Sequence, residues 1–407
     1  MDLTMSLSGI DLLLASPPVW RSARIALVTN QAAVTSRFQP SRLALMEAGF
    51  RLVRLFSPEH GLSAMGADGH RMGDGVDGLT GLPVVSLYGA APDGHGLRLA
   101  PVSEDLADVD VVLFDIPDVG SRFYTYLWTM THVLEACAGF GRPLVVADRA
   151  NPLSGSMELV EGPMLDEEGC GSFIGRWALP VRHSCTLGEL ASYFNRTRGI
   201  GCELEVVKCL GWDRGFFPVG RSFVPLSPAI SSFESALLYP GLCLFEATNL
   251  SEGRGTATPF RVVGAPWMRA GKVVEEFGRR MGCAGFAAGA CGVVARAVEF
   301  LPAEGKYAGY RCAGVMLHVI DVAAFRPVET GCLLLALIRE LHPDFFEWAP
   351  YPTHVNPRGL GHLDLLLGVR GAEGWFESAM TGDLESIRKY THGNEWAERI
   401  QPFLLYP

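Results

Sequence analysis

Short, almost wholly apolar runs alternate with helix-like segments through the first half of this chain, and this pattern constrains the fold more than any other feature. The runs are rich in aliphatic and β-branched residues and are expected to form strands at residues 24–29, 51–56, 83–87, 110–115, 143–147 and 204–207. Segments with helical spacing lie at residues 41–49, 131–141 and 186–195. Apolar strands separated by helices are typical of a parallel sheet that is covered on both faces. The sequence therefore predicts an α/β fold built on a mostly parallel sheet.

Length and a change in composition predict two domains. The chain has 407 residues, which is more than one ordinary hydrophobic core contains. Residues 211–232 are rich in glycine, proline, phenylalanine and serine, which indicates a long connecting loop. Beyond it, helix-like stretches at 271–282 and 333–344 flank a strand-rich region at 291–319. We predict a larger catalytic domain at residues 1–232 and a smaller α+β auxiliary domain at residues 233–407.

Charge and hydropathy exclude several classes of partner. The net charge of −10 provides no basic face for a nucleic acid. No apolar run reaches the ~18 residues of a membrane span, and the first residues lack the basic region of a signal peptide. We therefore expect a cytoplasmic protein without a nucleic-acid or membrane partner. A true start upstream of this sequence would instead favour a periplasmic or secreted protein.

Polar and aromatic side chains follow five of the predicted strands, at the point where each strand ends. In an open α/β sheet, ligands bind beyond the carboxyl ends of the strands, so we expect a functional site at this edge. The polar residues of these loops include Asn30, Glu59, His60, Tyr88, Asp115, Asp118, Arg122, Tyr124, Tyr126 and Asp148.

Glu59 and His60 stand side by side where a predicted buried strand reaches the surface. Burial beside Phe56 and aromatic loops would favour the protonated form of Glu59, which a general acid requires. A structural salt bridge or a solvated turn is the alternative. The role of His60 is open: it would tune Glu59, bind a ligand or hold the loop.

A second group of charged residues lies between glycines in the segment EATNLSEGRGTATPF, residues 246–260. Here Arg254 and neighbouring backbone N–H groups are suited to binding an anion, with Glu252 close by. A tight turn closed by a salt bridge is the alternative. His183 precedes a predicted helix, where it either contributes to the site or packs in the core.

No sequence signature of a cofactor or metal site is present. The first predicted strand is followed by TNQAAVTS rather than a GxGxxG loop, and neither a Walker loop nor an HExxH motif occurs. Several acidic and histidine residues in glycine-rich loops have a spacing that matches no known ligand pattern. These are Asp68, His70, Asp74, Asp93 and His95. We expect no cofactor and no metal, and a metal-dependent hydrolase is kept as an alternative.

The loop motifs, taken in order, resemble the exo-β-N-acetylmuramidases of the NamZ family over nearly the whole chain. The motifs are LVTNQAAV, FSPEHG, GLPVVSLYG, FDIPDVGSRFYTY, DRANP, RHSCTLGELA, LSPAISS and YPGLCLFEATNLSEGRGTATPF. The resemblance implies a Rossmann-like N-terminal domain, an auxiliary C-terminal domain and a cleft between them. It also implies an exo-acting glycosidase that removes N-acetylmuramic acid from the non-reducing end of peptidoglycan fragments during cell-wall turnover or recycling.

The same resemblance implies roles for individual residues. Glu59 is the expected catalytic acid, and His60 belongs to the same motif. The second carboxylate is open among Asp115, Asp118, Glu246 and Glu252, with Glu252 preferred. Its distance from Glu59 would separate a retaining enzyme (~5 Å) from an inverting one (~6.5–9.5 Å). Arg254 or Arg122 would bind the lactyl carboxylate of the substrate. The expected substrate-binding residues are Asn30, Asp115, Asp118, Arg122, Tyr124, Tyr126, His183 and Arg254.

Some motifs differ from the pattern of the family. Pro117 replaces a glutamine, Ala150 replaces a proline, and Ala229 stands where an asparagine amide is expected. The segment RHSCT also departs from the usual RHGMT. These changes leave the glycan preference open, and a non-catalytic protein that binds muropeptides or sugars is the alternative from a different class.

Overall fold

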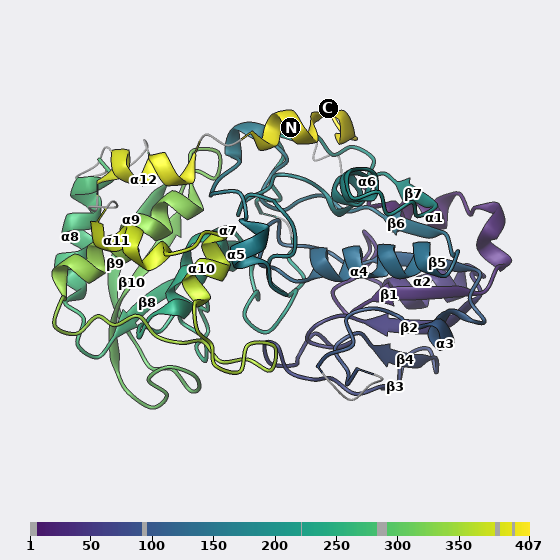
Figure 1. Ribbon diagram of the computed structural model, residues 1–407, viewed down its shortest axis with the longest axis horizontal. Coiled ribbons are helices and arrows are strands. Elements are labelled where there is room, and N and C mark those ends of the chain that lie inside the picture. The colour runs from purple at the N-terminus through teal and green to yellow at the C-terminus, as the bar shows by residue number, and fades with distance from the viewer. Residues whose placement is uncertain (1–5, 92–95, 221, 283–290, 379–382, 393–394) are drawn as a thin grey trace.

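The larger part of the molecule is a seven-stranded sheet with the strand order β3-β4-β2-β1-β5-β6-β7 (Figure 1). The computed structural model describes residues 6–91, 96–220, 222–282, 291–378, 383–392 and 395–407. The strands are β1 (Ile25–Thr29), β2 (Leu52–Ser57), β3 (Gly75–Val76), β4 (Pro83–Ser86), β5 (Val111–Asp115), β6 (Leu144–Ala147) and β7 (Leu204–Val207). All neighbouring strands pair in parallel except β3, which pairs antiparallel with β4. The predicted mostly parallel α/β sheet is confirmed.

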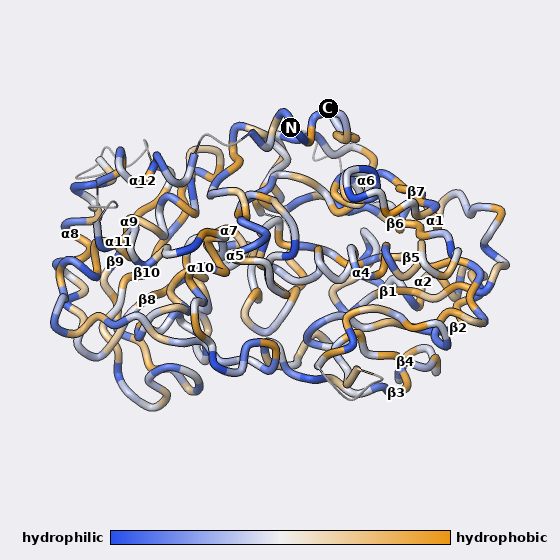
Figure 2. The backbone as a smooth tube through the Cα atoms, viewed as in Figure 1, coloured by the Kyte–Doolittle hydropathy of each residue, from blue (hydrophilic) through white to orange (hydrophobic). Residues whose placement is uncertain are grey.

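Alternate residues of each central strand enter two different apolar layers. Ile25 and Leu27 of β1 pack with α1 (Gly9–Ala15) and α2 (Ser41–Glu47) on one face of the sheet. Ala26 and Val28, on the opposite face, pack in a layer that includes α4 (Tyr126–Gly139) and α6 (Leu187–Thr197). Figure 2 shows apolar residues concentrated along these strands. Because both faces are covered, the central strands are mostly apolar, and this pattern is what the sequence shows.

The C-terminal part contains a smaller antiparallel sheet in the order β8-β10-β9. Its strands are β8 (Val262–Ala265), β9 (Val293–Phe300) and β10 (Cys312–Val319). The helices there are α7 (Phe233–Leu242), α8 (Ala270–Arg280), α9 (Pro327–Leu341), α10 (His362–Leu367), α11 (Ala372–Ser378), α12 (Leu384–Thr391) and α13 (Trp396–Ile400). The remaining short helices are α3 (Ser103–Leu106), α5 (Glu167–Cys170), η1 (Val19–Ser22), η2 (Met157–Leu159), η3 (Cys243–Ala247) and η4 (Gln401–Phe403). The predicted α+β character of this part is confirmed.

The two parts of the chain share one continuous apolar core. The layer beneath α4 extends without a break to Phe260 and to the buried leucines of α9. The end of the chain also returns to the large sheet, where Trp396 Nε1 donates to the carbonyl of His183 at 2.9 Å and the Tyr406 hydroxyl donates to Asp148 at 2.5 Å. The described residues of the predicted connecting loop, 211–220 and 222–232, contain no helix or strand. The division at residue 232 stays a prediction.

Within the part of the chain that the structure describes, no helix is long and apolar enough to cross a membrane.

Candidate active site

A cavity of about 60 Å³ lies where the loops of the large sheet meet the C-terminal part of the chain. The sheet loops contribute Glu59, His60, Asp68 and Tyr124 to its wall. The opposite wall contains Tyr239, Glu246, Arg254, Tyr351 and His362. One carboxylate, that of Glu246, and the guanidinium of Arg254 therefore face Glu59 and His60 across a space between the two parts of the chain. This agrees with the predicted cleft.

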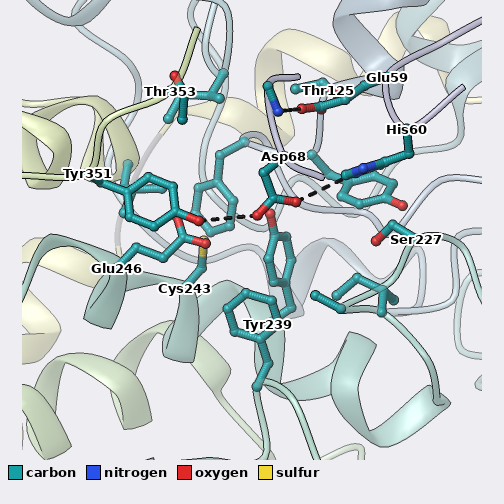
Figure 3. A pocket seen from close by; sticks show the side chains of 18 of the residues that line it. Glu59, His60, Asp68, Thr125, Ser227, Tyr239, Cys243, Glu246, Tyr351 and Thr353 are labelled. Atoms are coloured by element: carbon teal, nitrogen blue, oxygen red, sulfur yellow. Dashed lines mark hydrogen bonds and ion pairs between the residues drawn. The ribbon is translucent and has the colours of Figure 1, made fainter. Parts of the chain in front are cut away.

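Glu59 lies two residues beyond the end of β2, and its carboxylate is fixed by two donors. Gly69 donates its backbone N–H to Oε1 at 2.6 Å, and the Thr125 hydroxyl donates to Oε2 (Figure 3). Glu59 is only 5% exposed, so these bonds take the place of water.

Thr125 occupies the position just before α4, where a threonine side chain ordinarily accepts a bond from the helix backbone. In this protein it makes no capping bond, and its hydroxyl is directed to Glu59 instead. Helix α4 begins at Tyr126, earlier than the predicted start at residue 131, because the apolar residues after Tyr126 continue the helical spacing. The N-terminal end of α4 therefore lies beside Glu59, where its partial positive charge favours an anion.

His60 is held in a left-handed backbone conformation, with φ of 66°. Its Nδ1 lies 2.7 Å from the carbonyl of Gly66, which fixes the ring and leaves Nε2 directed toward Asp68 at 3.9 Å. A positive φ is costly for a residue other than glycine and is concentrated at functional sites. The histidine therefore orders the loop that carries both Asp68 and Gly69.

Arg254 is the centre of an ion-pair network on the opposite wall. Its Nη2 lies 2.6 Å from Asp68 Oδ2 and 2.7 Å from Glu246 Oε1, while its Nε lies 3.3 Å from Glu252. Glu246 is also bound by His362 Nε2 at 2.9 Å. Burial alone would raise the pKa of Glu246, but Arg254 and His362 outweigh it and lower that pKa to about 2. Glu246 is therefore a fixed anion at neutral pH.

Glu252, preferred from the sequence as the second catalytic group, is placed behind this wall. Its carboxylate lies 3.3 Å from Lys306 Nζ and is not among the groups that line the cavity. Lys306 also donates to the carbonyls of Phe245 and Glu246, at 2.8 and 3.1 Å. Glu252 thus holds Arg254 and Lys306 in position, whereas Asp68 and Glu246 are the carboxylates that share the cavity with Glu59.

Arg122 lies in the core rather than on the cavity wall. Its guanidinium is fully buried and donates to the carbonyls of Pro163, Leu179 and Leu366 at 2.6 to 2.9 Å. Burial lowers its pKa to about 9. In this position Arg122 joins three distant backbone segments, and it is not among the residues that line the cavity.

Other predicted site residues make hydrogen bonds and ion pairs that hold neighbouring segments of the chain together. Asn30 donates to the Tyr126 hydroxyl at 3.0 Å, and that hydroxyl donates to the carbonyl of Leu226 at 3.0 Å. Asp115 is buried and accepts from Arg149 at 2.7 Å. None of Asn30, Tyr126 and Asp115 lines the cavity.

Asp118 and His183 form a second buried pair away from the cavity, with Oδ2 and Nε2 4.0 Å apart. Burial raises the pKa of Asp118 to about 7, although the hydrogen bond from the backbone N–H of Gly120 opposes this shift. Burial and the nearby charge of Arg122 lower the pKa of His183 to about 3. Asp118 lines a separate cavity of about 640 Å³, beside Pro117 and Ala150. Of the departures from the family pattern, Ala229 is the one on the wall of the cavity that holds Glu59.

Several residues on the cavity wall were not predicted as part of the site. The sequence indicates Asp68 only as a possible metal ligand, and it gives Thr125, in the segment FDIPDVGSRFYTY, no predicted role. Tyr351 and His362 belong to a stretch rich in proline and glycine, YPTHVNPRGLGH, whose polar residues are the signal that was available. Their place in the site depends on contacts between distant parts of the chain.

Among the described residues, no group of three or more histidine, cysteine, aspartate or glutamate side chains is arranged to hold a metal ion. Asp93 and His95, two of the residues weighed as ligands, lie outside the described residues.

Comparison with known proteins gives matches along nearly the whole chain. The model of the exo-β-N-acetylmuramidase NamZ N-terminal region matches residues 25–234, and that of the NamZ C-terminal region matches residues 237–406. The peptidoglycan β-N-acetylmuramidase NamZ of Bacillus subtilis (strain 168) is 39% identical over 345 residues, which are 84% of this chain and 79% of that protein. Two crystal structures of DUF1343 family proteins from Bacteroides fragilis NCTC 9343 are similar over 99% of both chains, with TM-scores of 0.83 and 0.72 at 28% and 25% identity.

Proposed function

Because the chain belongs to the exo-β-N-acetylmuramidase NamZ family, we propose that it hydrolyses the bond that joins a terminal N-acetylmuramic acid to the rest of a peptidoglycan fragment. The protein is a glycosidase, and its partner is a glycan derived from peptidoglycan. Release from the non-reducing end, during turnover or recycling of the cell wall, is the form of this activity that the family membership favours.

One observation supports the assignment of the site: a carboxyl group and a guanidinium face the same cavity from opposite walls. The substrate presents a glycosidic oxygen, which needs a proton, and a lactyl carboxylate, which needs a cation. Glu59 and Arg254 are suited to these two tasks. Glycoside cleavage requires a carboxylic acid at the leaving oxygen and generally a second carboxylate.

The proposed roles follow from position. Glu59 donates its proton to the oxygen that leaves with the remaining glycan. Arg254 binds the lactyl carboxylate, and the rings of Tyr124, Tyr239 and Phe260 supply apolar surfaces for the sugar. Asp68 and Glu246 are the candidates for the second carboxylate, because they share the cavity with Glu59. Proton NMR of the anomer released first would show whether configuration is retained or inverted.

The test compares the wild type with Glu59→Gln on a chromogenic N-acetylmuramide and on an N-acetylmuramic acid–N-acetylglucosamine disaccharide. On the disaccharide, whose leaving sugar needs a proton, the loss of a general acid lowers the rate by about 10²- to 10⁴-fold, whereas a chromogenic substrate with a good leaving group is less affected. A matched control is Glu299→Gln, which makes the same change at an exposed residue paired with Arg311. If wild type and Glu59→Gln both bind the sugar and neither hydrolyses it, the protein is a binding protein. Loss of activity with a chelator and recovery with a divalent cation would point to a metal-dependent hydrolase.

The compartment is a further proposal. Cytoplasmic location was predicted from the sequence and would suit an enzyme that acts on imported fragments. Fractionation of cells that express the full-length gene with a C-terminal tag would test it, and recovery of the tag outside the cytoplasm would reject it.

A further inference from the structure

The cavity that holds Glu59 is too small for the substrate in the state described here. Its volume of about 60 Å³ compares with roughly 300 to 1,000 Å³ for ordinary ligand pockets. A sugar ring therefore enters only if part of the wall moves. Asp68 is one of the side chains on this wall, and it lies between Tyr351 and His60 in Figure 3.

Asp68 is bound as an external carboxylate would be bound. Arg254 Nη2 lies 2.6 Å from its Oδ2, the Tyr351 hydroxyl donates to the same oxygen at 3.1 Å, and His60 Nε2 lies 3.9 Å from Oδ1. Arg254 and Tyr351 thus bind the carboxylate of Asp68, and the ring of His60 lies beside it. Among the three acidic partners of Arg254, the side chain of Asp68 is 29% exposed, compared with 6% for Glu246 and 4% for Glu252. Asp68 is therefore the partner that can leave at the lowest cost.

We propose that Asp68 occupies the position of the substrate's lactyl carboxylate in the ligand-free enzyme, and that an acidic sugar opens the cavity by displacing it. This inference rests on the proposed function, and it makes Asp68 a positioning residue that sets specificity. Displacement exchanges one carboxylate for another at Arg254, so the charge balance of the buried network is kept. A neutral sugar such as N-acetylglucosamine supplies no anion to replace Asp68 at Arg254. Asp68 therefore stays in place and competes with the neutral sugar for the cavity.

Displacement of Asp68 also acts on Glu59 through the neighbouring residue. Gly69, next in the chain, donates its N–H to Glu59, and a Cβ at Gly69 would meet Thr353 at 3.0 Å. The same loop contacts the C-terminal part through His70, whose ring stacks on His354 with centroids 4.6 Å apart. Movement of this loop would withdraw the Gly69 N–H from Glu59 and so change the hydrogen bonds that position the proposed acid.

The experiment measures binding in the Glu59→Gln background, where turnover does not interfere. Isothermal titration with N-acetylmuramic acid and with N-acetylglucosamine compares Glu59→Gln with the double variant Glu59→Gln/Asp68→Asn. Asparagine keeps the shape of Asp68 but loses the charge that competes for Arg254. We expect N-acetylmuramic acid to bind about tenfold more tightly to the double variant, a change that corresponds to about 1.4 kcal/mol, while the affinity for N-acetylglucosamine is unchanged. Addition of Arg254→Met should abolish this gain.

Other outcomes would overturn the inference. Weaker or unchanged binding of N-acetylmuramic acid by Asp68→Asn would show that Asp68 does not compete with the ligand, and equal tightening for both sugars would show that it does not select for the carboxylate. A crystal structure with bound N-acetylmuramic acid supplies an independent measurement: Asp68 must lie away from Arg254, and an intact pair between them would refute the proposal. If the selective gain appears while the wild type hydrolyses no muramide, the proposed function fails and the carboxylate site stands. If the wild type hydrolyses the muramide but Asp68→Asn gives no selective gain in binding, the proposed function stands and the displacement of Asp68 is refuted.

Discussion

Replacement of Glu246 by glutamine is the perturbation whose energetic effect follows most directly from the structure. Glu246 is buried and is bound by Arg254 and His362, and its pKa falls from the ordinary 4.5 to about 2. A carboxylate with a lowered folded-state pKa stabilises the protein above its unfolded pKa, and this contribution is lost as the pH falls through the folded value. A pKa difference of this size contributes about 3 kcal/mol to the free energy of unfolding at pH 7 and about 2 kcal/mol at pH 3.5.

Glu246→Gln should therefore lower the free energy of unfolding by about 3 kcal/mol at pH 7 and by less at pH 3.5. The assay is urea denaturation followed by tryptophan fluorescence at the two pH values. Glu299→Gln is the matched control, because Glu299 pairs with Arg311 at an exposed position and such pairs contribute about 0 to 1 kcal/mol. The reasoning would be refuted if Glu246→Gln were as mild as the control at pH 7, or if its effect did not diminish in acid.

Three further predictions address residues around the site. Arg122→Met removes a donor from three carbonyls, one of which, that of Leu179, still accepts from the N–H of Leu165. The change should destabilise the fold by about 3 kcal/mol without a loss of kcat/KM in the folded enzyme; a selective loss of kcat/KM, measured alongside denaturation, would return Arg122 to the site. The pKa of Asp118, raised to about 7 by burial, makes the folded state bind a proton more tightly than the unfolded state, so wild-type stability should fall as the pH rises from about 4 to about 7. Asp118→Asn should lose less stability than wild type between pH 5 and pH 8, and denaturation curves with the same pH dependence would count against this. Thr125→Val removes a donor to Glu59 and should lower kcat/KM about tenfold, with recovery in Thr125→Ser; steady-state kinetics of both variants would test it, and no recovery with serine would indicate that the effect is one of packing.

The large sheet was predictable because its central strands are covered on both faces and are therefore mostly apolar. The two exposed residues of β3 carry no such pattern, and this strand was missed. The start of α4 was placed too late because Tyr126 belongs to both a polar loop motif and the apolar spacing of the helix.

The site was predictable only in part, because a sequence shows which residues share a loop but not which way each side chain points. Glu59, His60, Tyr124 and Arg254 reach the cavity, as expected. Arg122 lies only a few residues from Tyr124 but turns into the core, where carbonyls from three distant segments fix it. The pairing of Asp68 with Arg254 joins the two parts of the chain, and no local pattern could have revealed it.

The central claim is that Glu59 supplies the proton to the leaving glycan, and the leaving-group dependence of Glu59→Gln tests it most directly. A dinitrophenolate needs no protonation to depart, whereas a sugar hydroxyl does. We predict that Glu59→Gln loses about 10²- to 10⁴-fold in kcat/KM on the natural disaccharide and retains most of its activity on dinitrophenyl N-acetylmuramide. An equal loss on both substrates would contradict the assignment of Glu59 as the general acid.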